Sequence, residues 1–240
     1  MDDSTEESRG SWTLSVEPRV AVVGIGGAGC NIINDIYWTG DSGIETMAIN
    51  MDRKALSEVG AHRTINICRR VTRGEGAKGD PDLGRSCGKA HMDEIEEALQ
   101  GYDVVFIVAG MGGGTGTGVA PVVAEICRRL NQITFAVLIN PFSFETTRSR
   151  VAREGLRRMR QTGCINVVVD NDMLLKAMPD ATMDAAFREA NQSILGFING
   201  TTQKVKQRFI AQLDDMDEIV QESGDEEVSG LCAFEPVRIN

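Results

Sequence analysis

Short apolar runs alternate with stretches of helical periodicity along most of the chain. Strands are predicted for residues 20–24, 46–50, 64–68, 104–109, 133–139 and 165–169. These runs are apolar almost throughout, which is typical of parallel strands that are buried on both faces. Glycine or proline follows most of them. The pattern therefore predicts an α/β fold, with a parallel sheet and helices on both of its faces.

A longer helical pattern follows the last predicted strand, from Thr182 to about Val205. Apolar side chains recur at helical spacing, at Met183, Phe187, Ala190, Ile194, Phe197, Ile198 and Val205. We expect one long helix that crosses the domain. Thr182, Gly196 and Gly200 leave the exact positions of its two ends undecided. The sequence beyond it, QLDDMDEIVQESGDEEVSG, is strongly acidic.

Length and composition limit the classes of protein that the chain can belong to. With 240 residues and 42% hydrophobic content it can bury the core of one sizeable domain. It has no apolar window of about twenty residues, and its N-terminal segment, residues 1–18, is polar and acidic. We therefore expect a flexible N-terminal segment and a cytoplasmic protein. A formal charge of −10 disfavours nucleic acid and direct membrane binding.

Cysteine and histidine residues give no sign of a metal site. The six cysteines are scattered and contain no CxxC pair: Cys30, Cys68, Cys87, Cys127, Cys164 and Cys232. We expect buried thiols in a reducing compartment, without a metal or a disulfide. His62 and His91 have no nearby sequence partner, so we expect surface or packing roles for both.

The first predicted strand ends in the sequence GIGGAG, residues 24–29, and a helical pattern follows. Glycines in this position allow a dinucleotide phosphate to approach the backbone at a helix N-terminus, so the sheet is expected to be Rossmann-like. Taken alone the pattern also fits a nicotinamide-dependent dehydrogenase. Such an enzyme needs an acidic residue about twenty positions further on, and Glu45 or Asp52 would meet that need.

A second loop at residues 109–118, AGMGGGTGTG, is denser in glycine and precedes the helical pattern VAPVVAEICRRL. So many glycines cost conformational entropy in an ordinary turn, whereas their N–H groups can surround a cluster of anionic oxygens. This loop favours a phosphate site and disfavours the dehydrogenase. The GRSCGKA sequence at residues 84–90 is too short for a P-loop and lacks the final Ser/Thr, so we expect it on a helix surface.

The run AGMGGGTGTG followed by APVVAEI closely resembles the signature loop of the tubulin/FtsZ family, in particular its FtsZ branch. The resemblance continues in order from Val20 to about Gly224. It implies a GTPase domain over residues 19–224 with a long central helix, GTP or GDP as ligand, and Mg²⁺ as a cofactor. It also implies a cytoskeletal protein that assembles head to tail with itself.

The resemblance assigns functions to three further segments and implies a larger set of nucleotide contacts. RGEGAKGDPDLG, residues 73–84, corresponds to the loop that senses the terminal phosphate, and Glu145 in PFSFE corresponds to a ribose contact. Phe187 corresponds to an aromatic residue that stacks on guanine, although a core role fits it equally well, and Asn191 corresponds to the reader of the base edge. The nucleotide contacts implied are Gly26, Gly27, Ala28, Asn31, Asn50, Ala77, Lys78, Gly112, Gly113, Gly114, Thr115, Gly116, Thr117, Glu145, Arg148, Asn171, Phe187 and Asn191.

The segment QLDDMD, residues 212–217, is similar to the family's catalytic loop. Asp214 and Asp217 keep its acidic positions, and Gln212 stands where the family has asparagine. Carboxylates there can orient the water that attacks the γ-phosphate. A helix of about twenty residues is about 30 Å long, so these aspartates are expected to act on the nucleotide of a neighbouring subunit. The alternative is an acidic surface loop.

Three departures from the family pattern leave alternatives open. Lys78 replaces a glycine, where it either adds charge near the terminal phosphate or is solvated, and Ser149 replaces an arginine, with Arg148 and Arg150 on either side. Residues 225–240 are too few for the second domain of FtsZ-like proteins, so either a short divergent member or a fragment is expected. The alternative function is a non-hydrolysing GTP-binding regulator, with an FtsZ-like or adaptor protein as partner.

Overall fold

The computed structural model describes residues 17–39 and 43–223, with side chains through residue 212. All strands of its six-stranded sheet are parallel, in the order β3-β2-β1-β4-β5-β6. The strands are β1 (Val20–Ile25), β2 (Ile44–Asn50), β3 (Arg63–Asn66), β4 (Val104–Gly110), β5 (Ile133–Asn140) and β6 (Ile165–Asp170). The prediction of a parallel α/β sheet is thus confirmed, including each of the six strands.

The helices of the described residues connect these strands. They are α1 (Gly26–Thr39), α2 (Arg53–Ser57), α3 (Arg69–Thr72), α4 (Pro81–Ala90), α5 (Met92–Leu99), α6 (Gly114–Arg129), α7 (Thr146–Arg160), α8 (Asn171–Ala177) and α9 (Met183–Ser223). In this part of the chain none of them combines the length and hydropathy that crossing a membrane requires.

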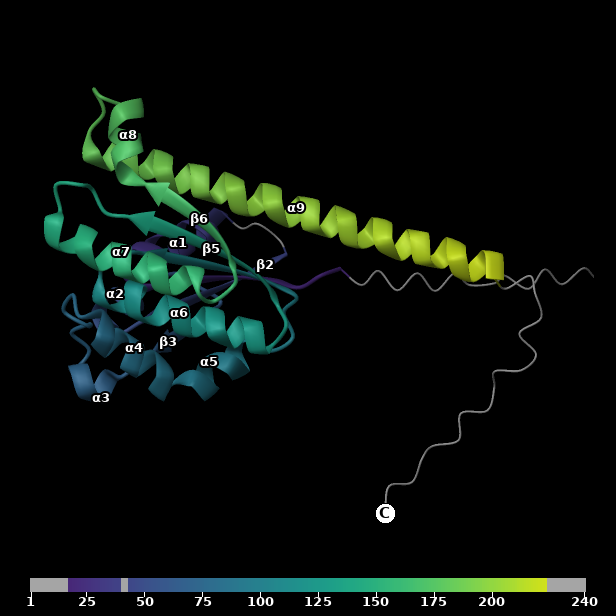
Figure 1. The fold of residues 1–240 in the computed structure, drawn as a ribbon, viewed down its shortest axis with the longest axis horizontal. Helices are drawn as coiled ribbons and strands as arrows, with labels where there is room; N and C mark the ends of the chain where they lie inside the picture. Colours follow the sequence, from purple (N-terminus) through teal and green to yellow (C-terminus); the bar gives the residue numbers. More distant parts are fainter. Residues whose placement is uncertain (1–16, 40–42, 224–240) are drawn as a thin grey trace, which may run out of the picture. The chain divides into compact units, whose positions relative to one another are not determined.

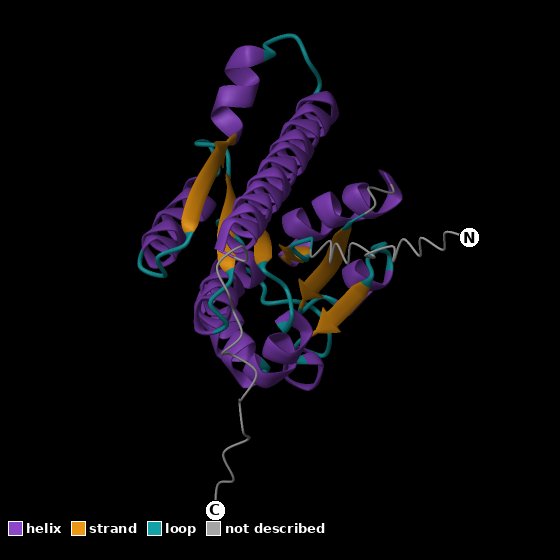
Figure 2. Cartoon of the chain, turned by 90° about the vertical axis from the view of Figure 1, so that its right-hand side faces the viewer, coloured by secondary structure: helices purple, strands orange, loops and turns teal. Residues whose placement is uncertain are grey.

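Helices cover both faces of the sheet, as Figures 1 and 2 show. Ala21, Val23 and Ile25 of β1 belong to the buried cluster that also contains the inner residues of α5, α6 and α7. The intervening β-strand positions face the other way, where Phe106 stacks on Phe135 and meets the edge of Phe197 from α9. The alternation of side chains along each strand therefore divides one apolar run between two cores.

The chain divides into two compact units. One is Pro18–Thr202, and it contains the whole sheet. The other joins Met1–Glu17 with Gln203–Asn240, and its described contact is an ion pair between Lys206 Nζ and Glu17 Oε2 at 2.9 Å.

Helix α9 corrects the sequence-based prediction of a helix end near Val205 and a loop at Gln212–Asp217. The backbone is helical through Ser223. Neither glycine nor proline occurs between Gly200 and Gly224, and most residues there are good helix formers. The acidic positions thus lie on a helix, and the side chains of Asp214 and Asp217 lie outside the described residues.

Cys68 and Cys87 form a disulfide, so the expectation of free thiols is wrong for this pair. The bond joins the turn after β3 to α4 across 19 residues of sequence. Sequence spacing gave no indication of the pair, because the fold alone brings its α carbons to 5.6 Å. The link closes a loop that contains residues 73–84, the segment expected to sense the terminal phosphate.

The predicted helical location of residues 84–90 is correct, but one side of this segment is buried. Gly84 and Gly88 of α4 pack on α6. A Cβ at Gly118 of α6 would lie 2.3 Å from the carbonyl oxygen of Pro81 and 2.6 Å from the nitrogen of Arg85. The two helices therefore approach backbone to backbone, and only glycine fits at this contact.

The Gly118→Ala substitution tests this contact. It should lower the free energy of unfolding by about 1–3 kcal/mol, because rigid backbone atoms must move to admit the methyl group. Gly196→Ala is the matched control, since a Cβ at this exposed helical glycine meets nothing within 4 Å. The control should be neutral or stabilising by up to about 1 kcal/mol. Urea unfolding measures both, and equal stabilities for the two variants would contradict the close approach.

Candidate functional site

A pocket of about 710 Å³ opens at the edge of the sheet where the strands end. Its residues include Gly26 directly after β1, Asn50 at the end of β2, Gly110 at the end of β4 and Asn140 at the end of β5. Parallel strands end on the same side, and the chain leaves β1 and β4 in opposite directions along the sheet. This is the position where open α/β sheets bind their ligands.

The N-termini of α1 and α6 both contribute to the pocket through Gly26, Gly27 and Ala28 on α1 and Gly114, Thr115 and Gly116 on α6. Neither helix has an acidic residue in its first turn, and the N-cap of α6, Gly113, makes no side-chain cap. The first N–H groups of both helices therefore lack intrahelical partners and face the pocket with the positive ends of two dipoles. Such an arrangement binds anions.

The two glycine loops touch each other at the pocket. Gly26 has φ +70°, a left-handed conformation that favours glycine, and a Cβ there would lie 3.0 Å from the backbone nitrogen of Gly116. Thr117 strengthens the second loop by accepting a hydrogen bond from the nitrogen of Gly112 at 2.8 Å. By contrast, a Cβ at Gly27 or Gly113 would meet nothing within 4 Å. Open space therefore remains beside both loops for a ligand.

The segment before α4 contributes Gly76, Ala77, Lys78 and Gly79 to the pocket. Lys78 has φ 47°, which is strained for a residue with a side chain, and its Nζ pairs with Glu75 Oε2 at 2.6 Å. The hydrogen bond from Lys78 holds the pKa of Glu75 below its ordinary value. An exposed cation is thus present at the pocket, at the position where the resemblance implies a glycine.

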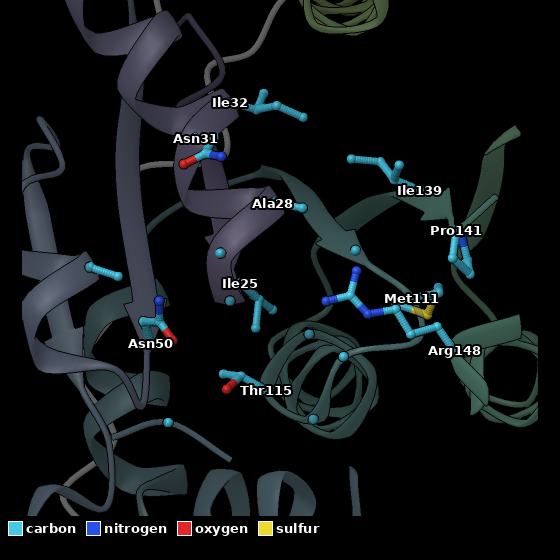
Figure 3. A pocket seen from close by; sticks show the side chains of 18 of the residues that line it. Ile25, Ala28, Asn31, Ile32, Asn50, Met111, Thr115, Ile139, Pro141 and Arg148 are labelled. Carbon is cyan, nitrogen blue, oxygen red and sulfur yellow. The ribbon is translucent and has the colours of Figure 1, made fainter. Parts of the chain in front are cut away.

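The opposite wall is formed by the segment between β5 and α7. Glu145 Oε1 accepts from the nitrogen of Phe142 at 3.2 Å, and Oε2 accepts from Arg148 Nη1 at 2.8 Å. In Figure 3 the guanidinium group of Arg148 reaches toward Ala28 of α1. Arg148 lines the pocket, whereas Arg150 does not. The arginine that borders the pocket therefore lies one position before Ser149.

Two residues of α9 contribute the side of the pocket that suits an aromatic ring. Phe187 is 41% exposed and meets Phe142 edge to face, with ring centroids 5.7 Å apart, so it is not a core residue. Asn191 Nδ2 donates to Asp35 Oδ2 on α1 at 2.9 Å. A carboxylate only accepts, so the amide nitrogen must face Asp35 and the carbonyl oxygen is left as an acceptor.

Two other amides of the pocket carry buried acceptors without partners. Among the described residues, Asn140 Oδ1 and Asn171 Oδ1 are inaccessible and have no hydrogen bond. Both residues line the pocket, at the end of β5 and at the start of α8. Buried acceptors are nearly always satisfied in proteins, so this wall fits a ligand that brings N–H or O–H donors.

The structure brings sixteen of the eighteen predicted nucleotide contacts into this one pocket. The other two, Gly112 and Thr117, form the loop behind it. Gln212 is exposed in the other unit, and the side chains of Asp214 and Asp217 are outside the described residues. Sequence reasoning missed Asn140, whose only signal was its position at the end of a predicted strand. The binding roles of all these residues stay predictions.

Glu45, Cys30 and the two histidines, which could have indicated dinucleotide binding or catalysis, have structural roles. Glu45 binds Arg19 and Tyr102 at the start of β2, away from the pocket, so it cannot contact a ribose there. Burial raises the pKa of the Cys30 thiol to about 12, which leaves it protonated and non-nucleophilic. His62 accepts from the nitrogen of Thr46, and His91 accepts from the nitrogen of Cys68. The predicted surface or packing roles of both histidines are confirmed.

Comparison with known proteins agrees with this geometry. Residues 19–179 match the model of the tubulin/FtsZ family, GTPase domain. The chain is 37% identical to cell division protein FtsZ 1 of Pyrococcus horikoshii, over 88% of this chain and 57% of that protein. It is 40% identical to cell division protein FtsZ 2 of Methanocaldococcus jannaschii, over 82% of this chain and 52% of that protein.

Solved structures of FtsZ and CetZ proteins share the fold of this chain. An empty FtsZ dimer of M. jannaschii superposes with a TM-score of 0.76 at 38% identity, over 80% of this chain and 57% of that chain. CetZ2 of Haloferax volcanii, solved as a protofilament with GTPγS, shares the fold with a TM-score of 0.68 at 24% identity. The chain spans little more than half the length of the relatives that it matches. It belongs to the tubulin/FtsZ family, and its six-stranded sheet is that family's GTPase domain.

Proposed function

We propose that this chain binds GTP and GDP at the edge of its sheet and hydrolyses GTP when it assembles head to tail with further copies. The observation that carries the proposal is the convergence of two helix N-termini without acidic residues, those of α1 and α6, on one pocket. Two such termini favour a ligand with several anionic groups over one with a single charge.

The phosphates would lie against backbone N–H groups of the two glycine loops. Lys78 would exchange its exposed pair with Glu75 for the terminal phosphate, which offers more negative charge. No cluster of three His, Cys, Asp or Glu side chains suited to a metal occurs among the described residues. Mg²⁺ would therefore depend on phosphate oxygens and water for most of its ligands, as is common for this ion.

Guanine selectivity would come from Asn191. Asp35 fixes its amide so that the carbonyl oxygen is the free acceptor, and the N1–H and exocyclic amine of guanine are donors. Adenine presents an acceptor at N1 and lacks this pair of donors. Phe187 would stack on the base, and Glu145 would accept from the ribose, because each carboxylate oxygen can accept more than one hydrogen bond.

Hydrolysis would need a second subunit. Asn191 and Asp214 are 23 residues apart on the continuous helix α9. At a rise of 1.5 Å per residue, 23 residues correspond to about 35 Å along the helix. This distance is much longer than the reach of a side chain. Asp214 and Asp217 of one copy would then orient the attacking water at the γ-phosphate of the next copy. A heterologous contact of this kind repeats as a filament.

The Gly27→Val substitution tests the phosphate site. A Cβ at Gly27 contacts no protein atom within 4 Å, so the side chain should leave stability nearly unchanged and fill space that the ligand needs. We expect nucleotide affinity to fall at least about tenfold, equivalent to about 1.4 kcal/mol. Fluorescence titration with a labelled GTP analogue measures the affinity. A folded variant with unchanged affinity would exclude this loop from the site.

The Asn191→Ala substitution tests base recognition. It should weaken GTP binding by about 1–3 kcal/mol and leave the weak binding of ATP unchanged. Only guanine has N–H donors that lose their acceptor when the Asn191 carbonyl oxygen is removed. Arg188→Ala, an exposed position on the same helix, is the control and should affect neither nucleotide. Competition titrations with the two nucleotides measure the ratio. Equal losses for GTP and ATP would remove Asn191 from base selection.

The concentration dependence of turnover tests the shared active site. GTPase activity per molecule should rise with protein concentration, and Asp214→Ala should reduce it by two or more orders of magnitude without changing nucleotide affinity. Phosphate release measured alongside pelleting follows both quantities. Constant specific activity would refute the shared site. Tight GTP binding without any turnover would favour the alternative, a non-hydrolysing regulator.

A further inference from the structure

The negative charge of this chain is concentrated in the last part of α9 and the residues that follow it. Residues 10–213 contain 23 Lys and Arg against 22 Asp and Glu, so they are almost neutral. Residues 214–227 contain eight Asp and Glu and no basic residue. The net charge of −10 therefore gives a poor description of the surface that the folded part presents to a partner.

The largest concentration of positive charge lies on the helices of one face. Helix α7 has six arginines and one glutamate among its 15 residues, and α6 ends in two arginines. A groove of about 470 Å³ lies between α4, α5, α6 and α7, and it shares no residue with the nucleotide pocket. Five arginines and two glutamates carry its charge; the arginines are Arg85, Arg128, Arg129, Arg157 and Arg158.

Part of this charge is held in a fixed arrangement. Glu154 accepts from Arg157 at 2.9 and 3.0 Å and from Arg158 at 3.1 Å, and Arg158 also reaches Asp82 of α4 at 3.2 Å. The hydrogen bonds from Arg157 and Arg158 lower the pKa of Glu154 to about 2. Each guanidinium group has five N–H donors, so donors remain after these bonds, on side chains that have already lost part of their rotamer freedom.

Two further arginines of the groove have no carboxylate partner in the described part of the chain. Arg85 on α4 is half-buried and Arg128 on α6 is exposed, and no acidic oxygen lies within 4 Å of either guanidinium group. Guanidinium forks match carboxylates in a planar, bidentate manner. The groove thus presents unused donors for an acidic ligand, between walls that include Met92 and Pro121.

We propose that this groove binds the acidic segment Glu218–Glu227 of a second copy of the same chain. The segment has five carboxylates and no basic residue, and it follows the two aspartates proposed for hydrolysis without including them. Charge complementarity selects it, because its five carboxylates and no basic residue face a groove that is rich in arginine. The contact is a second self-association surface, independent of the nucleotide and sensitive to salt.

Binding of a synthetic peptide to the full-length protein tests the groove. A fluorescein-labelled peptide of residues 216–230 should bind without nucleotide, and its affinity should fall several-fold between about 0.05 and 0.3 M salt. Joint substitution of Arg128→Glu and Arg157→Glu should weaken binding about tenfold or more. The control pair, Arg63→Glu with Arg70→Glu, makes the same charge change on exposed positions outside the groove and should have little effect.

Three results would overturn the proposal. One is equal peptide binding by the groove variant and the control pair. Another is equal binding of a peptide with every acidic residue replaced by its amide. The third is tighter binding of polyuridine RNA than of the peptide, with the same sensitivity to the groove substitutions, which would make the groove a phosphate-polymer site. Circular dichroism melting of each variant keeps folding defects apart from these outcomes.

Sedimentation velocity of the full chain tests whether the ligand comes from a second copy. Association in low salt without nucleotide should be lost when Glu222, Asp225, Glu226 and Glu227 are replaced by their amides. A chain that stays monomeric while the peptide binds would mean that the segment occupies its own groove, and it would overturn the second-copy contact. GTP binding and turnover of the same variants distinguish this failure from failure of the proposed GTPase function, because neither Asp214 nor the nucleotide pocket is changed.

Discussion

The pairing of β1 with β4 is the constraint on which the site depends. These two strands are parallel neighbours, and each is followed directly by a glycine-rich entry into a helix. Two helix N-termini therefore lie side by side at one edge of the sheet, and no other element has to be placed accurately to create an anion site. The remaining elements determine which anion fits and which chemical groups bonded to that anion the pocket can accommodate.

The loop that borders the pocket beside the N-terminus of α6 is held by close packing of two helices. Helix α4 lies against α6 through glycines, so the preceding segment, Gly76 to Gly79, is brought close to the N-terminus of α6. The Cys68–Cys87 disulfide closes the same region from its other end. A loop rich in left-handed residues is entropically costly to order, and these two restraints offset part of that cost. Lys78 can thus be held beside the pocket despite its strained backbone.

The sequence was sufficient for the sheet and for most of the pocket, because both depend on local patterns. Continuous apolar runs identified all six strands, although no residue of β6 and only one residue of β3 is buried, and the density of glycine after β4 pointed to a candidate anion site. Tertiary features could not be read in this way. The disulfide depends on two segments that only the fold brings together, and the hydrogen bond between Asp35 and Asn191 joins residues 156 positions apart. The end of α9 was predicted too early because the apolar periodicity stops near Val205, whereas the helix propensity of the following polar residues favours continuation through Ser223.

The two proposed binding surfaces recognise negative charge by different means, and this difference makes them separable. The nucleotide pocket relies mainly on backbone N–H groups and helix dipoles, which are fixed by the fold and lie within a partly enclosed site. The groove relies on guanidinium groups at an open surface, several already paired with carboxylates. Mobile ions screen exposed charge pairs far more than enclosed dipoles. Assembly through the groove would therefore respond to ionic strength, whereas assembly through the nucleotide would respond to hydrolysis, so one chain would have two independent controls on self-association.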